Sequence, residues 1–283
     1  MTIAASPTST FFMLPFSELI HQRRSAAEAL RYAIGDDWLQ GRTCFGGLVS
    51  ALAAHAMREK AGAGWSTPVN LLALQTSFVA PVGPGDIEVS VSVLRQGKNV
   101  CQVLAHVRQH AQVVAVLMGT YGAARASALE TRRPVPQALP HSVEALPAAP
   151  QRAAGPPSFL QHFDLRWAAG PPPFSGGSGW HSSQFIRLRD PELASLPSEL
   201  QVVLLADLAP TPVMGQLSQH APNSSVSWAL ELRALTAPAA DGWWRADNES
   251  LLVEDGYVNH AARLWSPDDR LAAFGTQVVA VFA

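Results

Sequence analysis

Apolar residues recur at helical spacing in two stretches of the chain. In the first stretch these residues are Leu48, Val49, Leu52, Ala53, Ala56 and Met57. Gly62 is typical of a helix end, so we expect the first helix to stop there. In the second stretch, the apolar positions are Leu200, Val203, Leu204 and Leu208. Ser198 and Gln201 have capping-box spacing, and the pattern predicts a second helix over 198–208.

Alternating or continuously apolar runs surround both predicted helices and predict strands. The clearest run covers 86–94, where Ile87, Val89, Val91 and Val93 alternate with polar residues. The other strands predicted in the first half cover 71–78, 100–107 and 112–121. Those predicted in the second half cover 159–167, 183–189, 224–233, 243–253, 258–265 and 271–282.

The two halves look like one unit written twice. The glycine turn at Leu94–Lys98 and the one at Glu254–Tyr257 are each followed by a run of alternating residues. We therefore expect an N-terminal repeat over 1–122, an Ala- and Pro-rich linker over 123–157 and a C-terminal repeat over 158–283. The linker can also lie as a strap on the surface. One helix and one antiparallel meander per repeat predict an α+β double hotdog, a continuous curved sheet with both helices on its concave face.

Composition and charge limit the kinds of partner and the cellular location that we expect for the protein. The net charge is -2 and charged residues make up 15% of the chain, with no basic stripe, so we expect no nucleic-acid partner. The apolar run at 11–14 is far too short to span a membrane, and no basic leader suggests a signal peptide. Cys44 and Cys101 are too few for a disulfide framework. We therefore expect a cytoplasmic protein.

Asp207 is the sharpest candidate for chemistry. It occupies position i+7 of the apolar stripe in the second predicted helix, where a carboxylate loses hydration and needs partners. Buried carboxylates are rare without a function, which favours a catalytic role. The structural alternative is an aspartate near the helix end that turns outward or caps the turn at Pro210.

Two further polar positions lie in predicted strands. Gln277 lies in an apolar closing strand, where its amide can donate to a carboxylate and hold a water molecule. The structural alternative is an edge-strand residue that faces solvent. Ser224 and Ser225 open another strand. A hydroxyl group is common at a strand start simply because serine favours turns.

Phe45, Gly46 and Gly47 precede the first predicted helix. Backbone N–H groups at a helix start can polarise a carbonyl oxygen, although glycine serves tight packing equally well. We find no Gly-x-Ser-x-Gly nucleophile motif, no Walker loop and no histidine spacing typical of a metal site. Cys44 lies just before the helix and is a minor candidate for a nucleophile.

The chain resembles the double-hotdog acyl-CoA thioesterases, the thioesterase II-like family. In the first half the resemblance lies in Gly41-Arg42, Phe45-Gly46-Gly47, Ser77–Pro81 and Leu94–Lys98. In the second half it lies in Asp207, a hydroxyl residue that opens the next strand, and Gln277. The family uses an Asp, a Thr or Ser, and a Gln to orient one water molecule. The resemblance implies that Asp207, Ser225 and Gln277 have these roles, with Ser224 as a competing match and serine in place of the usual threonine.

The resemblance also implies the reaction and the partners. It implies hydrolysis of an acyl-CoA thioester to a carboxylic acid and coenzyme A without a cofactor or a metal, in lipid metabolism, with Phe45, Gly46 and Gly47 near the substrate. A non-catalytic acyl-thioester-binding module and a hotdog dehydratase or hydratase are the alternatives, although we find no histidine that matches a dehydratase site. The doubled unit can pair again into a homo-oligomer, and its oligomeric state stays open.

Overall fold

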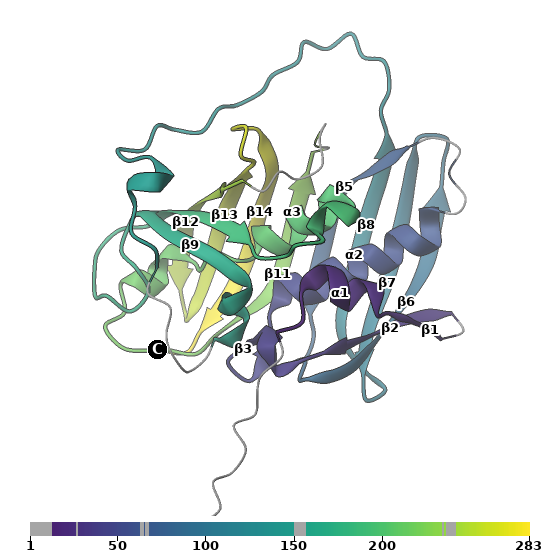
Figure 1. Ribbon diagram of the computed structural model, residues 1–283, viewed down its shortest axis with the longest axis horizontal. Coiled ribbons are helices and arrows are strands. Elements are labelled where there is room, and N and C mark those ends of the chain that lie inside the picture. Colours follow the sequence, from purple (N-terminus) through teal and green to yellow (C-terminus); the bar gives the residue numbers. More distant parts are fainter. Residues whose placement is uncertain are drawn as a thin grey trace, which may run out of the picture.

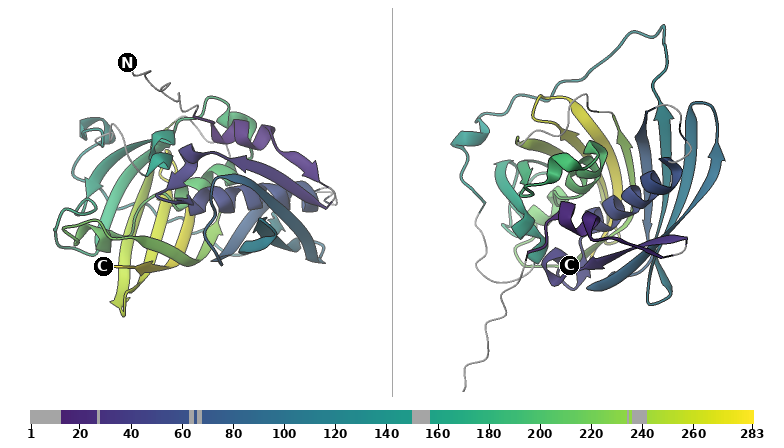
Figure 2. Two further views of the ribbon diagram at one scale, coloured as in Figure 1. Left: turned by 90° about the horizontal axis from the view of Figure 1, so that it is seen from below. Right: turned by 45° about the vertical axis from the view of Figure 1, so that its right-hand side comes forward.

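The dominant feature of the computed structural model is a twelve-stranded antiparallel sheet that curves around two helices (Figure 1). The structure describes residues 13–26, 28–62, 65, 68–149, 157–233, 235 and 242–283. Figure 2 shows the helices α2 and α3 inside the curve of the sheet. The α+β double hotdog prediction is therefore confirmed in its architecture.

The first half supplies a short entry and then a helix followed by a meander. The entry consists of α1 (Phe16–His21), β1 (Arg24–Ala26), β2 (Ala29–Ile34) and the small hairpin of β3 (Leu39–Gln40) and β4 (Thr43–Cys44). After it come α2 (Gly46–Gly62), β5 (Val69–Phe78), β6 (Gly85–Gln96), β7 (Val100–Gln109) and β8 (Gln112–Ala123). The predicted strands were right in type and short by one or two residues at several ends.

The second half repeats the pattern, and β9 (Phe163–Ala169) and β10 (His181–Leu188) take the edge positions that β1 and β2 have in the first half. Its other elements are α3 (Ser198–Ala206), β11 (Asn223–Leu232), β12 (Trp244–Glu254), β13 (Tyr257–Trp265) and β14 (Leu271–Val281). Residues 158–162 form a 3₁₀-helix, so the strand predicted over 159–167 begins too early. The capping-box prediction is wrong, because Pro197 is the N-cap and no side chain caps the helix.

The two halves join through strands β5 and β11. These strands pair antiparallel, with Thr76 opposite Trp228 and Leu74 opposite Leu230. The strand order β1-β2-β6-β7-β8-β5-β11-β14-β13-β12-β10-β9 therefore runs through the junction without a break. Both central helices can then bury their side chains against one continuous concave face.

The helices α2 and α3 pack against each other in opposite directions. Gly47 at the start of α2 lies against the end of α3, because a Cβ atom built on it would lie 2.9 Å from the Leu204 carbonyl oxygen. Near the other end, Arg58 of α2 forms a salt bridge with Glu199 in the first turn of α3. No helix in the described part of the chain is long and apolar enough to cross a membrane.

Residues 124–149 run as an exposed strap from β8 towards the second half (Figure 1). Arg245 donates to the Gln137 carbonyl, and Arg166 donates to the carbonyls of Val143, Glu144 and Leu146. The described part of the predicted linker is thus fixed to the second half by side-chain donors, while residues 150–156 lie outside the described residues. The domain boundaries at 122 and 158 stay a prediction.

Candidate active site

Asp207 lies where the end of α3 meets the start of α2. The helix α3 ends at Ala206, one residue before Asp207, which is the C-cap with φ -98° and ψ -2°. The Asp207 side chain turns inward rather than outward, towards α2 and the sheet. Its carboxylate accepts a hydrogen bond from the backbone N–H of Gly47 in the first turn of α2.

Gln277 meets Asp207 from the sheet. It lies on β14 opposite Trp228 of β11, and residues directly opposite each other in an antiparallel pair share a face. Trp228 is buried, so this is the concave face of the sheet. The Gln277 Nε2 atom donates to Asp207 Oδ1 at 2.5 Å. The structure therefore brings together two residues that are far apart in the sequence.

Gly46 and Gly47 allow this close approach because they have no side chain. A Cβ atom on Gly46 would lie 2.9 Å from Asp207 Oδ2 and 3.1 Å from the ring of Phe78. A Cβ atom on Gly47 would lie 2.5 Å from the ring of Phe45. Contacts below 3.0 Å force a neighbour to move, so these glycines set the distance between the two helices at the site.

Burial raises the pKa of Asp207 from its usual value to about 7, which outweighs the hydrogen bonds from Gln277 and Gly47 that lower it. Neither donor carries a charge, so among the described residues the carboxylate has two partners and no counter-ion. The C-terminal end of α3 also carries a partial negative charge. Asp207 can therefore exchange a proton near neutral pH, as a general base requires.

The two candidate serines lie on opposite faces of β11. Ser225 pairs with Val279, which is buried and lies two residues beyond Gln277 on the same face. Ser224 pairs with Ala280, is exposed and donates to the Ser225 carbonyl oxygen. In the described part of the chain, no hydrogen bond joins Ser225 to Asp207 or Gln277. Diagonal neighbours in a sheet lie roughly 7–8 Å apart, which one water molecule can bridge.

A row of buried and partly buried side chains extends the site across five strands. From β5 to β12, the residues that lie opposite one another are Thr76, Trp228, Gln277, His260 and Ser250. Sequence reasoning identified Gln277 in this row and missed the others as site neighbours. The alternation of each strand places them inward, but only the register between strands puts them in one row.

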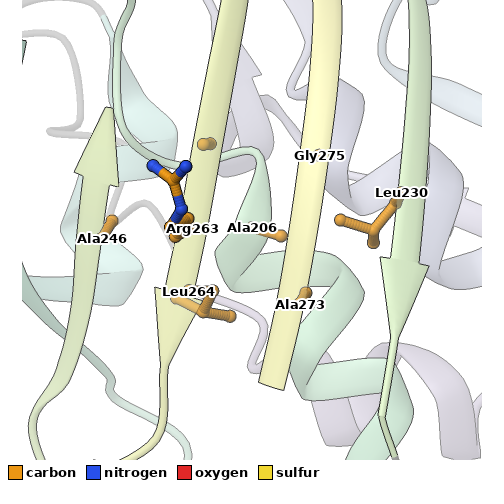
Figure 3. A pocket seen from close by; sticks show the side chains of 8 residues that line it. Ala206, Leu230, Ala246, Arg263, Leu264, Ala273 and Gly275 are labelled. Atoms are coloured by element: carbon orange, nitrogen blue, oxygen red, sulfur yellow. The ribbon is translucent and has the colours of Figure 1, made fainter. Parts of the chain in front are cut away.

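A cavity of about 10 Å³ lies beside this row, under the end of α3 (Figure 3). Small side chains line most of it, with Ala206 from α3 facing Ala246, Ala262, Ala273 and Gly275 from the sheet. A cavity of this size holds about one water molecule. The small side chains therefore leave a small free space inside the second half. One of the residues that line it, Ala206, directly precedes Asp207.

The remaining candidates have other surroundings. Cys44 is buried, and burial raises the pKa of its thiol far above the usual value, which disfavours the thiolate that a nucleophile needs. His55 of α2 contacts the Tyr32 hydroxyl through Nδ1 at 2.7 Å. Among the described residues, no group of three His, Cys, Asp or Glu side chains could hold a metal ion.

Two family models cover most of the chain. Residues 34–122 match the acyl-CoA thioesterase N-terminal domain, and residues 140–281 match the acyl-CoA thioesterase C-terminal domain. Asp207 and Gln277 fall in the second match, and Gly46 and Gly47 fall in the first. No curated protein matches the chain.

Solved structures share the fold at low sequence identity. A conserved protein of unknown function with hot dog fold from Alicyclobacillus acidocaldarius is 19% identical, with a TM-score of 0.79 over 95% of this chain and 98% of its own. An acyl-CoA thioesterase II, TesB2, from Mycobacterium marinum is 16% identical, with a TM-score of 0.71 over 94% and 98%. A tesB protein from Mycobacterium avium subspecies paratuberculosis is 13% identical, with a TM-score of 0.73 over 95% and 98%.

Proposed function

We propose that this chain, which belongs to the acyl-CoA thioesterase family, hydrolyses an acyl-CoA thioester with one water molecule that Asp207 activates. The observation that supports this proposal most strongly is the contact between Asp207 and Gln277 at the junction of the two helices. An uncharged donor beside a carboxylate with a raised pKa favours proton transfer over a fixed ion pair.

In this mechanism Asp207 is the general base. The Gln277 amide holds the carboxylate in place and, together with the Ser225 hydroxyl, positions the water molecule. Asp207 takes one proton from the water as its oxygen attacks the acyl carbonyl carbon. Because the water supplies the new C–O bond, no acyl-enzyme intermediate is needed.

The start of α2 lies beside the attack site and can stabilise the developing oxyanion. The first N–H groups of a helix have no partner within the helix, and Gly46 and Gly47 place two of them here. Gly47 already donates to Asp207, which leaves Gly46 as the proposed oxyanion donor. The tetrahedral intermediate then breaks its C–S bond and releases coenzyme A as a thiolate, which takes up a proton afterwards.

The raised pKa of Asp207 gives the reaction a defined pH dependence. Only the ionised carboxylate can accept a proton, so kcat should rise as the pH passes through about 7 and level off above it. Folding has the opposite dependence. The folded pKa lies above the ordinary value of 3.8, so the folded state retains this proton up to a higher pH than the unfolded state. The contribution of Asp207 to stability is therefore full below pH 4 and falls as the pH rises through about 7.

A panel of acyl-CoA thioesters tests the proposal. Each thioester is mixed with the full chain, and free coenzyme A is measured with a thiol reagent over a range of pH values. Release of thiol with a pH profile whose midpoint lies at about 7 is the expected result. Binding of thioesters without release of thiol from any of them would contradict the proposal and favour an acyl-binding module. The acyl group, a cytoplasmic location and a homo-oligomeric state stay predictions.

A further inference from the structure

His260 is the nearest neighbour of Gln277 across the β13–β14 ladder. The two residues lie directly opposite each other, so their side chains share the concave face. Facing Cβ atoms in such pairs lie roughly 4.5–5.5 Å apart, within reach of two long polar side chains. His260 is 4% exposed, whereas Gln277 is partly exposed. His260 is therefore the more buried member of this pair.

The imidazole of His260 is a buried polar group with one unsatisfied nitrogen. Its Nδ1 atom has no hydrogen-bond partner in the described part of the chain. A buried donor or acceptor left unpaired is destabilising, so such a group calls for an explanation. Burial also lowers the pKa of His260 to about 4, so the ring is neutral and has one N–H group.

Ser250, the other neighbour of His260 in the row, already makes hydrogen bonds to other residues. Ser250 lies opposite His260 on β12, and its hydroxyl contacts the Thr211 hydroxyl at 2.9 Å. It also accepts the backbone N–H of Val213 at 3.2 Å. These contacts attach the turn after α3 to the sheet. Gln277 is then the neighbour in the row that has an unused hydrogen-bonding atom for the ring.

That unused atom is the Gln277 amide oxygen, for which the described residues show no hydrogen bond. The NH₂ group of the amide faces Asp207, so Oε1 points elsewhere. An amide can rotate by half a turn and present its oxygen instead of its nitrogen. In that orientation Asp207 would lose a donor and face a second oxygen. A donor on the other side of the amide would prevent the rotation.

We propose that His260 is a positioning residue whose ring Nδ1–H holds the Gln277 amide oxygen through one bridging water molecule and so keeps the NH₂ group on Asp207. This inference deepens the proposed function and rests on it for the catalytic consequence alone. The contact between Gln277 and Asp207 itself is independent of the reaction.

Three substitutions of His260 separate its hydrogen bond from its volume. His260→Leu removes both ring nitrogens at similar size. His260→Asn places an N–H donor near the position of Nδ1, whereas His260→Gln places it near Nε2. Ser182→Ala is the matched control, because Ser182 is another buried polar residue whose hydroxyl has no partner in the described part of the chain.

The first measurement is the titration of the Asp207 carboxyl group by carbon-13 NMR, with Asp207→Asn to assign the signal. Loss of the oriented donor should raise the Asp207 pKa by about 0.5–1 unit in His260→Leu and His260→Gln. His260→Asn and Ser182→Ala should titrate like the parent protein. This measurement needs no substrate, so it decides the role of His260 even if no thioester is hydrolysed.

The second measurement is the kinetics with the best thioester from the panel. A displaced amide should lower kcat about tenfold in His260→Leu, by analogy with the loss of a residue that orients a catalytic group, and leave KM within about twofold. His260→Asn should restore kcat. The proposal is overturned if His260→Leu keeps both the Asp207 titration and kcat of the parent protein. If His260→Leu does not fold, equal Asp207 titrations in His260→Asn and His260→Gln overturn it.

Discussion

The two ends of the α2–α3 helix pair have the same architecture and opposite chemistry. At one end Asp207, Gln277 and Gly47 form an uncharged set of donors around a carboxylate. At the other end Glu199 accepts two hydrogen bonds from the Arg58 guanidinium and one from the backbone N–H of Leu71. Within the part of the chain that the structure describes, one carboxylate thus has no counter-ion, and the other has a bidentate one.

The register of the strands shows that these ends are equivalent. Gly119 lies opposite Leu74 in the first half, and Gly275 lies opposite Leu230 in the second. Two residues after these glycines come Tyr121 and Gln277. The Tyr121 hydroxyl donates to the Ala54 carbonyl oxygen of α2, and its ring lies 5.6 Å from the Arg58 guanidinium carbon.

Where Gln277 contacts a carboxylate, its counterpart Tyr121 contacts a backbone carbonyl and an arginine of α2. Burial raises the pKa of Tyr121 far above its usual value, so the hydroxyl stays protonated. Duplication of the unit therefore yields one end suited to proton transfer and one end suited to holding the helices together. A bidentate arginine–carboxylate pair fixes charge and geometry, whereas a carboxylate with neutral donors can exchange a proton.

The strongest test of this difference removes one charge at each end. Asp207→Asn should lower kcat by about 10²-fold or more, because it removes the general base. Glu199→Gln makes the same chemical change and should leave kcat within about threefold while lowering the melting temperature. The comparison would fail if both substitutions lowered kcat equally, as measured by release of coenzyme A.

Removal of the cation tests the structural end alone. Arg58→Met keeps much of the side-chain length and leaves the Glu199 carboxylate, which is 12% exposed, without its counter-ion. The free energy of unfolding should fall by about 1–3 kcal/mol, less than for a fully buried pair. Urea unfolding measures this change, and kcat below the transition serves as the control. An unchanged unfolding midpoint would show that the ion pair does not stabilise the helix pair.

The close approach of the helices at the active end can be tested with one methyl group. Gly46→Ala places a Cβ atom 2.9 Å from Asp207 Oδ2, so the carboxylate must shift, and we expect kcat to fall about tenfold. Gly62→Ala is the matched control at the far end of α2, where the nearest atom would lie 3.9 Å away. Equal kcat values for the two variants would show that the space at Gly46 does not determine the position of the carboxylate.

The smallest expected effect concerns the hydroxyl group. Ser225→Ala should lower kcat by roughly threefold to tenfold, because Ser225 lies on the concave face and can share a water molecule with Gln277. Ser224→Ala removes an exposed hydroxyl on the other face and should have no effect. If Ser224→Ala has the larger effect on kcat, the assignment of the hydroxyl moves to that residue.

Much of this arrangement could be predicted from local patterns. The apolar stripe of the second helix located Asp207 on its inward side, and period-two alternation located most strands within one or two residues. The exact end of α3 was missed by two residues, because Asp207 and Leu208 continue the apolar stripe beyond the last helical hydrogen bonds. The 3₁₀-helix at 158–162 was read as strand, because a short apolar segment does not distinguish the two.

The sequence by itself determined which residues turn inward, because that depends on the period of each element alone. It thereby determined the doubled fold and the two apolar helices with an acid on the second. The tertiary structure decided which inward residues meet. The pairing of β13 with β14 places His260 beside Gln277, and the crossing of α2 over α3 gives Asp207 the Gly47 amide and Glu199 the Arg58 guanidinium. These contacts join residues distant in the chain, and their register depends on the packing of the whole sheet.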